Sequence, residues 1–342
     1  MKKSKYRVFL ALLSCLLFAL GVLFGFLFDF RFGAKEAQAA TPARAECVVE
    51  VSSRRILSSR NESAPLPMAS TTKVLTAAIV IEDCDLQEEV VIPPEGAGVE
   101  GSSVYLKAGE RYTVEELLYG LMLRSGNDCA VTLALHHSGS IARFAQVMNE
   151  RAAMMGAQDS YFENPHGLPS ANHVTSARDL ALISAYALEN PTFAKIVSTK
   201  YYAPRNWKNK NKMLFEYDGA LGVKTGFTTA AGRCLVTAAE RNGMKTVSVV
   251  LNCGEMYLRS AELLNDAFQT YEIVQLCDKE FRYEGLQAKY DFFYPLTEAE
   301  RELVRVEIEK NSPLPTVRGE IAGRMTISLS NRLLFSQNLY IM

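Results

Sequence analysis

The chain has 342 residues, of which 48% are hydrophobic and 22% are charged, and its formal net charge is −1. This length suits one large domain and a smaller one. The composition is that of a folded globular protein, which excludes a disordered chain or one with many membrane spans. The near-neutral charge provides no basic surface for nucleic acid, so we expect no nucleic-acid partner.

The first forty residues have the pattern of an export signal. A basic segment, MKKSKYR, precedes an apolar run from Val8 to Phe28, and small residues at Ala37 and Ala39 fit a cleavage site. The run is also long enough to cross a bilayer. We therefore expect residues 1–39 to be a signal peptide or an N-terminal membrane anchor, and the rest of the protein to be exported.

The cysteines and histidines do not have the spacing of a metal site. Seven cysteines and four histidines are present, without a CxxC pair or an HExxH pattern. We expect neither a metal nor another cofactor. The pairing of the cysteines stays open.

Residues 40–275 have the pattern of one domain that contains both helices and strands. Two short strands are predicted within 47–63, and helical spacing of apolar residues follows. The helices are predicted at 71–81, 113–139 with a break at Ser125–Asn127, 140–157, and 176–189 with Ser176 as N-cap.

From Gly219 onward, the spacing of apolar residues changes to that of β-strands. Strands are predicted at 219–228, 232–240 and 245–253, and a helix is predicted at 258–274. We interpret residues 40–275 as an α/β (α+β) domain with an antiparallel sheet flanked by helices and a helical subdomain. Alternating polar and apolar residues predict a small all-β domain at 276–342.

A serine and a lysine stand three residues apart in MASTTKVLTA, where the first helix begins. Ser70 and Lys73 share one helical face. Apolar neighbours disfavour the charged amine and lower its pKa, so that it can take the proton of the serine. The alternative is a capping serine with an exposed lysine, and this motif alone does not decide between them.

Two further motifs have side chains suited to catalysis or binding. In SGN, Ser125 and Asn127 project from a helix break, where a hydroxyl can move a proton and a carboxamide can hold an amide. In KTG, Lys224, Thr225 and Gly226 lie on a strand predicted at a sheet edge, where the glycine allows another backbone to approach. A capping turn and an ordinary strand end are the alternatives.

In this order, the three motifs resemble the signature set of penicillin-binding proteins and serine β-lactamases. The segments PMASTTKVLTA, LLYGLMLRSGNDCAVTLA, FENPHGL, TSARDLALIS, GALGVKTGFT and LRSAELLNDAF are similar to the low-molecular-weight penicillin-binding proteins that act as serine-type D-alanyl-D-alanine carboxypeptidases. The likeness runs from about Glu46 to Tyr271. It implies a β-lactamase/transpeptidase-like catalytic domain at 40–275, and the remainder is similar to the smaller C-terminal domain of that family.

The resemblance implies a role for each motif residue. Ser70 would attack the carbonyl between two terminal D-alanines, Lys73 would take its proton, and Ser125 would relay a proton to the departing D-alanine. Backbone N–H groups of Ser70 and Phe227 would form the oxyanion hole. Lys224 would supply positive potential. The implied substrate-binding residues are Asn127 for the substrate amide, Thr225 and Arg259 for the free carboxylate, and Lys224, Gly226 and Phe227.

The same resemblance implies partners and a location. Peptidoglycan stem peptides would be the substrates, and β-lactams would acylate Ser70 and leave slowly. The protein would act outside the cytoplasm, facing the cell wall, and would be secreted or held in the membrane through its N-terminal segment.

Two alternatives stay open. A class A β-lactamase needs a glutamate four residues before an asparagine. Glu163 lies in the right region but position 167 is glycine, which argues against efficient β-lactam hydrolysis. A non-catalytic penicillin-sensing or wall-binding protein would not need both Ser70 and Lys73.

One residue departs from the pattern of the family: Phe227 stands where a polar residue is often found. For two further residues we expect structural roles, with His166 shaping the pocket wall and Asp179 bracing local hydrogen bonds.

Overall fold

The computed structural model describes residues 42–342, so the predicted signal peptide or anchor at 1–39 lies outside the described residues. Within 42–342, no helix combines the length and the apolar character that a membrane span requires.

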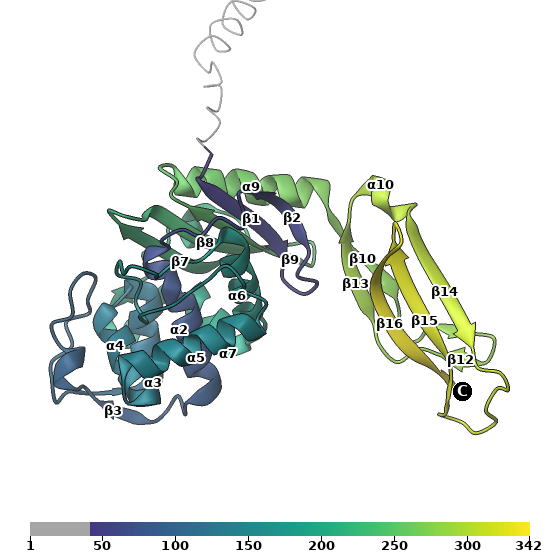
Figure 1. Ribbon diagram of the computed structural model, residues 1–342, viewed down its shortest axis with the longest axis horizontal. Helices are drawn as coiled ribbons and strands as arrows, with labels where there is room; N and C mark the ends of the chain where they lie inside the picture. Colours follow the sequence, from purple (N-terminus) through teal and green to yellow (C-terminus); the bar gives the residue numbers. More distant parts are fainter. Residues whose placement is uncertain (1–41) are drawn as a thin grey trace, which may run out of the picture. The chain divides into compact units, whose positions relative to one another are not determined.

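A five-stranded antiparallel sheet forms the centre of the larger, N-terminal part (Figure 1). Its strand order is β2-β1-β9-β8-β7, which places β7 at an edge, as predicted. The turn RNGM joins β8 to β9 in a hairpin. The strands are β1 (Ala45–Glu50), β2 (Ile56–Arg60), β7 (Ala220–Thr228), β8 (Gly232–Arg241) and β9 (Met244–Leu251).

Helices cover both faces of this sheet, which explains why its inner strands are apolar on both sides. On β8, Leu235 belongs to an apolar cluster with Leu264 of helix α9 (Met256–Thr270). Val236, its neighbour, belongs to the larger cluster that includes Leu75 and Ile183. The helices on that side are α2 (Lys73–Asp83), α3 (Val114–Tyr119), α4 (Asn127–Ser138), α5 (Ile141–Met154), α6 (Ala177–Glu189) and α7 (Pro191–Ser198).

The predicted helix breaks and caps are confirmed, with local differences. The segment 113–139 consists of α3, a π-helical turn η3 (Gly120–Arg124), a left-handed residue at Ser125, and α4. Ser176 caps α6 by accepting the N–H of Asp179. The first predicted helix begins as a 3-10 turn, η1 (Ala69–Thr72), before α2.

The prediction of a helix over 258–274 is wrong at its end. Helix α9 stops at Thr270, and β10 (Glu272–Cys277) follows it. The β-branched and apolar residues of EIVQLC favour a strand, and β10 pairs with β13 (Phe292–Leu296) in a two-stranded sheet. Strand β10 therefore runs across residue 275, the predicted domain boundary.

The C-terminal residues form the expected β domain. A second five-stranded sheet has the order β11-β12-β16-β15-β14 and an apolar core that includes Leu286, Met325, Ile327 and Leu339. Its strands are β11 (Arg282–Tyr283), β12 (Leu286–Gln287), β14 (Val304–Lys310), β15 (Ile321–Leu329) and β16 (Arg332–Ile341).

Candidate active site

Ser70 lies in the 3-10 turn η1, and the neighbouring loop fixes the shape of this turn. Ala69 has a φ of 51°, which places the backbone in the left-handed region immediately before the serine. The Thr72 hydroxyl donates to the carbonyl of Ala69 at 2.9 Å, so it accepts from Nε2 of His173, also at 2.9 Å. Gly167 packs against the same carbonyl, since a Cβ there would lie 1.8 Å from the oxygen. The turn therefore leaves little room for rearrangement.

Lys73 is fully buried, which excludes the exposed lysine of the alternative interpretation. Its Nζ lies 2.8 Å from Oγ of Ser70, 2.6 Å from Oδ1 of Asn127 and 2.8 Å from the carbonyl oxygen of His166. Burial, and then the nearby charge of Lys224, hold the pKa of Lys73 well below its usual 10.5. In its neutral form, the amine of Lys73 can donate its two N–H groups to the oxygens of Asn127 and His166. Its lone pair can then accept the hydroxyl of Ser70.

The helix break places Ser125 and Asn127 beside this amine. Ser125 has a φ of 64° and is 5% exposed. The carboxamide of Asn127 accepts from Lys73 and donates from Nδ2 to the carbonyl of Glu100 at 2.6 Å. Asn127 therefore orients the lysine. It can hold a substrate amide after exchanging its bond to Glu100.

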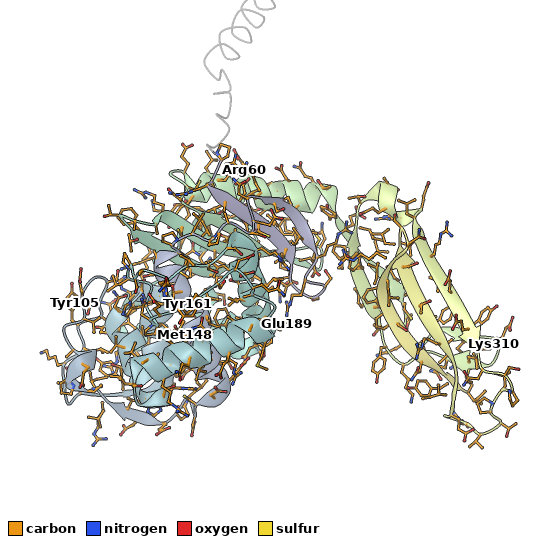
Figure 2. All side chains as sticks on the ribbon, in the orientation of Figure 1. Arg60, Tyr105, Met148, Tyr161, Glu189 and Lys310 are labelled. Carbon is orange, nitrogen blue, oxygen red and sulfur yellow. The ribbon has the colours of Figure 1, made fainter. Side chains whose placement is uncertain are left out.

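Asp128 holds the loop that forms one wall of the site. Its buried carboxylate accepts the N–H groups of Val104 at 3.0 Å and Leu106 at 3.2 Å. Tyr105, between them, is 84% exposed and projects from the loop (Figure 2). Ser102 of the same loop accepts the N–H of Asn127 at 2.7 Å. Asp128 was not predicted as part of the site, because an aspartate in the first turn of a helix is common and does not by itself indicate a role.

The edge strand β7 provides the opposite wall. Lys224 is 2% exposed and donates to the carbonyl of Thr225 at 2.8 Å. Burial, and then Lys210, lower the pKa of Lys224 to about 7. A Cβ on Gly226 would lie 3.0 Å from the backbone nitrogen of Ser70, so the predicted close approach of two backbones is confirmed.

Most of these groups open on one cleft with a volume of about 260 Å³. The cleft is lined by Ser70, Ser102, Ser125, Lys210, Thr225, Gly226, Phe227, Arg233, Met256 and Tyr257. Lys73 and Asn127 lie behind it: Lys73 contacts Ser70, and Asn127 contacts Lys73. Five of the lining residues belong to no sequence motif and were not predicted: Ser102, Lys210, Arg233, Met256 and Tyr257. The pairing of β7 with β8 is the signal that could have indicated Arg233.

Arg259 has a different environment from the one expected. Its guanidinium forms two bonds with the carboxylate of Glu46, at 2.7 and 3.0 Å, and a third with Glu262 at 3.0 Å. Glu46 is 4% exposed. Arg259 is not among the described residues that line the cleft.

The remaining predicted residues support the loop around the site. The carboxylate of Asp179 accepts the N–H of Asp159 at 2.6 Å and the hydroxyl of Ser160 at 2.8 Å, which confirms its bracing role. The carbonyl of His166 accepts from Lys73, and burial lowers the pKa of the His166 ring to about 3. The carboxylate of Glu163 accepts hydrogen bonds from Ser170 and Asn172. Glu163 is not among the described residues that line the cleft.

A nucleophilic serine in a cleft, a buried lysine with a lowered pKa in contact with it, and a β-strand edge define a serine acyl-transfer enzyme of the penicillin-binding type. Residues 33–254 match the model of the Peptidase_S11 family, described as D-alanyl-D-alanine carboxypeptidase. The chain belongs to this family and is a serine-type D-alanyl-D-alanine carboxypeptidase.

Individual relatives agree with this assignment. D-alanyl-D-alanine carboxypeptidase DacF of Bacillus subtilis (strain 168) is 30% identical over 313 residues, which cover 86% of this chain and 80% of the relative. DacA of Haemophilus influenzae is 29% identical over 348 residues, covering 92% and 87%. The crystal structure of penicillin binding protein 5 from Haemophilus influenzae superposes with a TM-score of 0.74 at 27% identity, covering 91% of this chain and 98% of that one.

Proposed function

We propose that the protein removes the terminal D-alanine from peptidoglycan stem peptides through an acyl-enzyme on Ser70. The 2.8 Å contact between Lys73 and Ser70 carries this proposal. As Oγ attacks the carbonyl between the two D-alanines, the neutral amine of Lys73 takes the hydroxyl proton. The N–H groups of Ser70 and Phe227 stabilise the negative oxygen that forms.

The second half of acylation requires a proton donor for the leaving group. Ser125 lines the cleft beside Ser70 and passes a proton from Lys73 to the amine of the departing D-alanine. The peptide bond then breaks and D-alanine leaves. Water attacks the ester, releases the shortened peptide and restores the Ser70 hydroxyl.

The cleft also orients the peptide. An extended stem peptide pairs with the free edge of β7, and Gly226 holds this edge close to the Ser70 turn. Asn127 binds an amide of the substrate, and Lys224 adds positive potential beneath the strand. Thr225 donates its hydroxyl to the terminal carboxylate. Arg259 is the other residue that the resemblance implies for binding this carboxylate, and without substrate its guanidinium is paired with Glu46.

β-Lactams acylate Ser70 in the same way and leave slowly. A class A β-lactamase activates the deacylating water with a glutamate, and here Glu163 is turned toward Ser170 and Asn172. We further propose that the protein acts outside the cytoplasm, facing the cell wall. If the N-terminal segment is retained, residues 8–28 hold it in the membrane.

The direct test is to incubate the purified protein with a peptide that ends in D-Ala-D-Ala and to follow free D-alanine. Release by the wild type, none by Ser70→Ala, and covalent penicillin mapped to Ser70 are expected. Loss of labelled penicillin within seconds would favour a β-lactamase. A wild type that binds penicillin but releases no D-alanine would favour the non-catalytic alternative.

A further inference from the structure

A short hairpin of the catalytic domain concentrates positive charge. Residues 200–216, KYYAPRNWKNKNKMLFE, contain five basic side chains and one acidic side chain, although the whole chain has a net charge of −1. The hairpin consists of β5 (Tyr201–Tyr202) and β6 (Trp207–Lys208), and residues 209–212 lead from it to helix α8 (Met213–Glu216). In the part of the chain that the structure describes, the four lysines of this segment form no ion pair.

The sequence KNKNK at 208–212 turns its lysines outward and its asparagines inward. Asn209 and Asn211 are 5% and 2% exposed, whereas the three lysines are exposed. The carboxamide of Asn209 donates to the carbonyls of Val197 and Thr199 at 3.3 and 3.1 Å, and that of Asn211 accepts a backbone N–H at 3.1 Å. These buried bonds fix the backbone, so the lysines stay on the solvent side.

Aromatic rings hold the hairpin against the π-helical turn η3. The ring of Tyr202 stacks on that of Tyr119 with centroids 4.0 Å apart, and on that of Trp207 at 6.0 Å. The guanidinium of Arg124 donates to the carbonyl of Lys208 at 3.0 Å. The lysines therefore stand on a part of the fold that is packed and hydrogen-bonded.

One exposed ring gathers two of the ammonium groups. Nζ of Lys208 lies 4.9 Å, and Nζ of Lys200 5.8 Å, from the ring centroid of Phe215, which is 46% exposed. Nζ of Lys212 lies 5.8 Å from the ring centroid of Tyr257. Cation–π contacts favour these positions, while the like charges repel one another. Anions bound at this place would relieve the repulsion.

We propose that Lys200, Lys208 and Lys212 bind a linear phosphodiester polymer of the cell envelope, with Phe215 holding the first two lysines in place. We call these three lysines the lysine surface. Several cations without acidic partners fit a ligand with repeated negative charge, and lysine binds phosphate as a point charge, whereas arginine suits the paired bonds of a carboxylate. The choice of an envelope polymer rests on the proposed location outside the cytoplasm.

The lysine surface is separate from the catalytic groups and lies next to them. Lys210, from the same segment, lines the cleft and is not part of the lysine surface. None of the three proposed lysines is among the described residues that line the cleft. A polymer bound there holds the enzyme beside the cell wall without occupying the site of acylation.

The test is calorimetric titration of the purified protein with a synthetic glycerol phosphate oligomer at several salt concentrations. Affinity for the wild type should fall as salt rises, because bound lysines release the counterions of the polymer. Lys200→Gln/Lys208→Gln/Lys212→Gln should weaken binding about 10- to 100-fold at low salt, as for the loss of three exposed ion pairs. Its plot of log affinity against log salt should be shallower by about two. Phe215→Leu should weaken binding about 2- to 5-fold, through the lost cation–π contacts.

A matched control removes the same charge elsewhere. Arg143→Gln/Lys279→Gln/Arg318→Gln changes three exposed positions outside the hairpin and should bind the oligomer like the wild type. Equal weakening in the two triple variants would overturn the proposal, because it would show a response to net charge alone. Both variants should acylate with penicillin at the wild-type rate, which checks the fold and the cleft separately.

Two further ligands distinguish other partners. Poly-L-glutamate presents carboxylates along a chain, and vesicles of phosphatidylglycerol present phosphates on a membrane. Tighter binding of either one than of the oligomer would overturn the assignment to a phosphodiester polymer, and so would a wild type that does not bind the oligomer. Ser70→Ala should bind the oligomer unchanged, so the proposed carboxypeptidase function is decided by D-alanine release and not by this titration.

Discussion

The amine of Lys73 lies 2.8 Å from the hydroxyl oxygen of Ser70 and 2.6 Å from the carboxamide oxygen of Asn127. Lys73→Met preserves most of the side-chain volume but cannot accept a proton. We expect the rate of penicillin acylation to fall about 10²- to 10⁴-fold, as for the loss of a general base. Quenched-flow labelling measures this rate. Lys195→Met, at an exposed position of α7, is the matched control, and equal rates in both variants would refute the role of Lys73.

The contact between β7 and the Ser70 turn depends on a glycine. A Cβ on Gly226 would lie 3.0 Å from both the nitrogen of Ser70 and the carbonyl oxygen of Met68. Gly226→Ala should push the strand away and lower the acylation rate about 10²-fold, since such rates fall steeply with displacement. Gly254→Ala is the control, because its Cβ would meet nothing within 4 Å. A rate as high as that of the control would show that the close approach is not required.

The pH dependence of acylation should reflect two lysines with opposite requirements. Lys73 must be neutral, and burial and the nearby charge of Lys224 favour this form by lowering its pKa. Lys224 must be charged, and its charge is lost as the pH rises through about 7. We expect kcat/KM to fall on the alkaline side of about 7. In Lys224→Arg this fall should move to higher pH, because guanidinium stays charged. If kcat/KM fell at the same alkaline pH in the wild type and in Lys224→Arg, loss of charge on Lys224 would be excluded as the cause.

His173, which is buried, and His166, which is partly buried, make the fold sensitive to acid. Burial lowers the pKa of His173 to about 4 and that of His166 to about 3, against 6.5 when exposed. Between these values the unfolded chain binds more protons than the folded one, so stability is complete above about 6.5 and is lost as the pH falls toward about 4. Urea unfolding at pH 7, 6 and 5 measures this slope. His173→Gln should flatten it, and an unchanged slope would contradict the assignment.

Local patterns were sufficient to predict the elements that carry the motifs. The apolar, strand-forming runs of β7 to β9 and the helical spacing around Ser125 follow from residues close in the chain. The C-terminal domain was predicted only as a whole, and the alternating pattern did not single out β16, which spans Arg332–Ile341. Its pairing with β15 has irregularities near Ile321 and Ile327, and such bulges disturb the period of two on which a sequence prediction depends.

Contacts between distant residues explain what the sequence could not predict in the site. The bond between Thr72 and His173 joins residues 101 positions apart, and the Arg259–Glu46 pair joins residues 213 apart. The chemistry of an arginine suits a substrate carboxylate and a protein carboxylate equally well. Only the folded arrangement shows that Arg259 pairs with the carboxylate of Glu46.

The Arg259–Glu46 pair should contribute mainly to stability. In Arg259→Gln, the carboxylate of Glu46 stays buried without an opposite charge, and breaking such a pair costs about 3–5 kcal/mol. Urea unfolding should show a loss of this order at neutral pH. The double variant Arg259→Gln/Glu46→Gln should recover part of it, since no uncompensated charge remains. If Arg259→Gln left stability intact and abolished carboxylate selection, its guanidinium would belong to the substrate and not to Glu46.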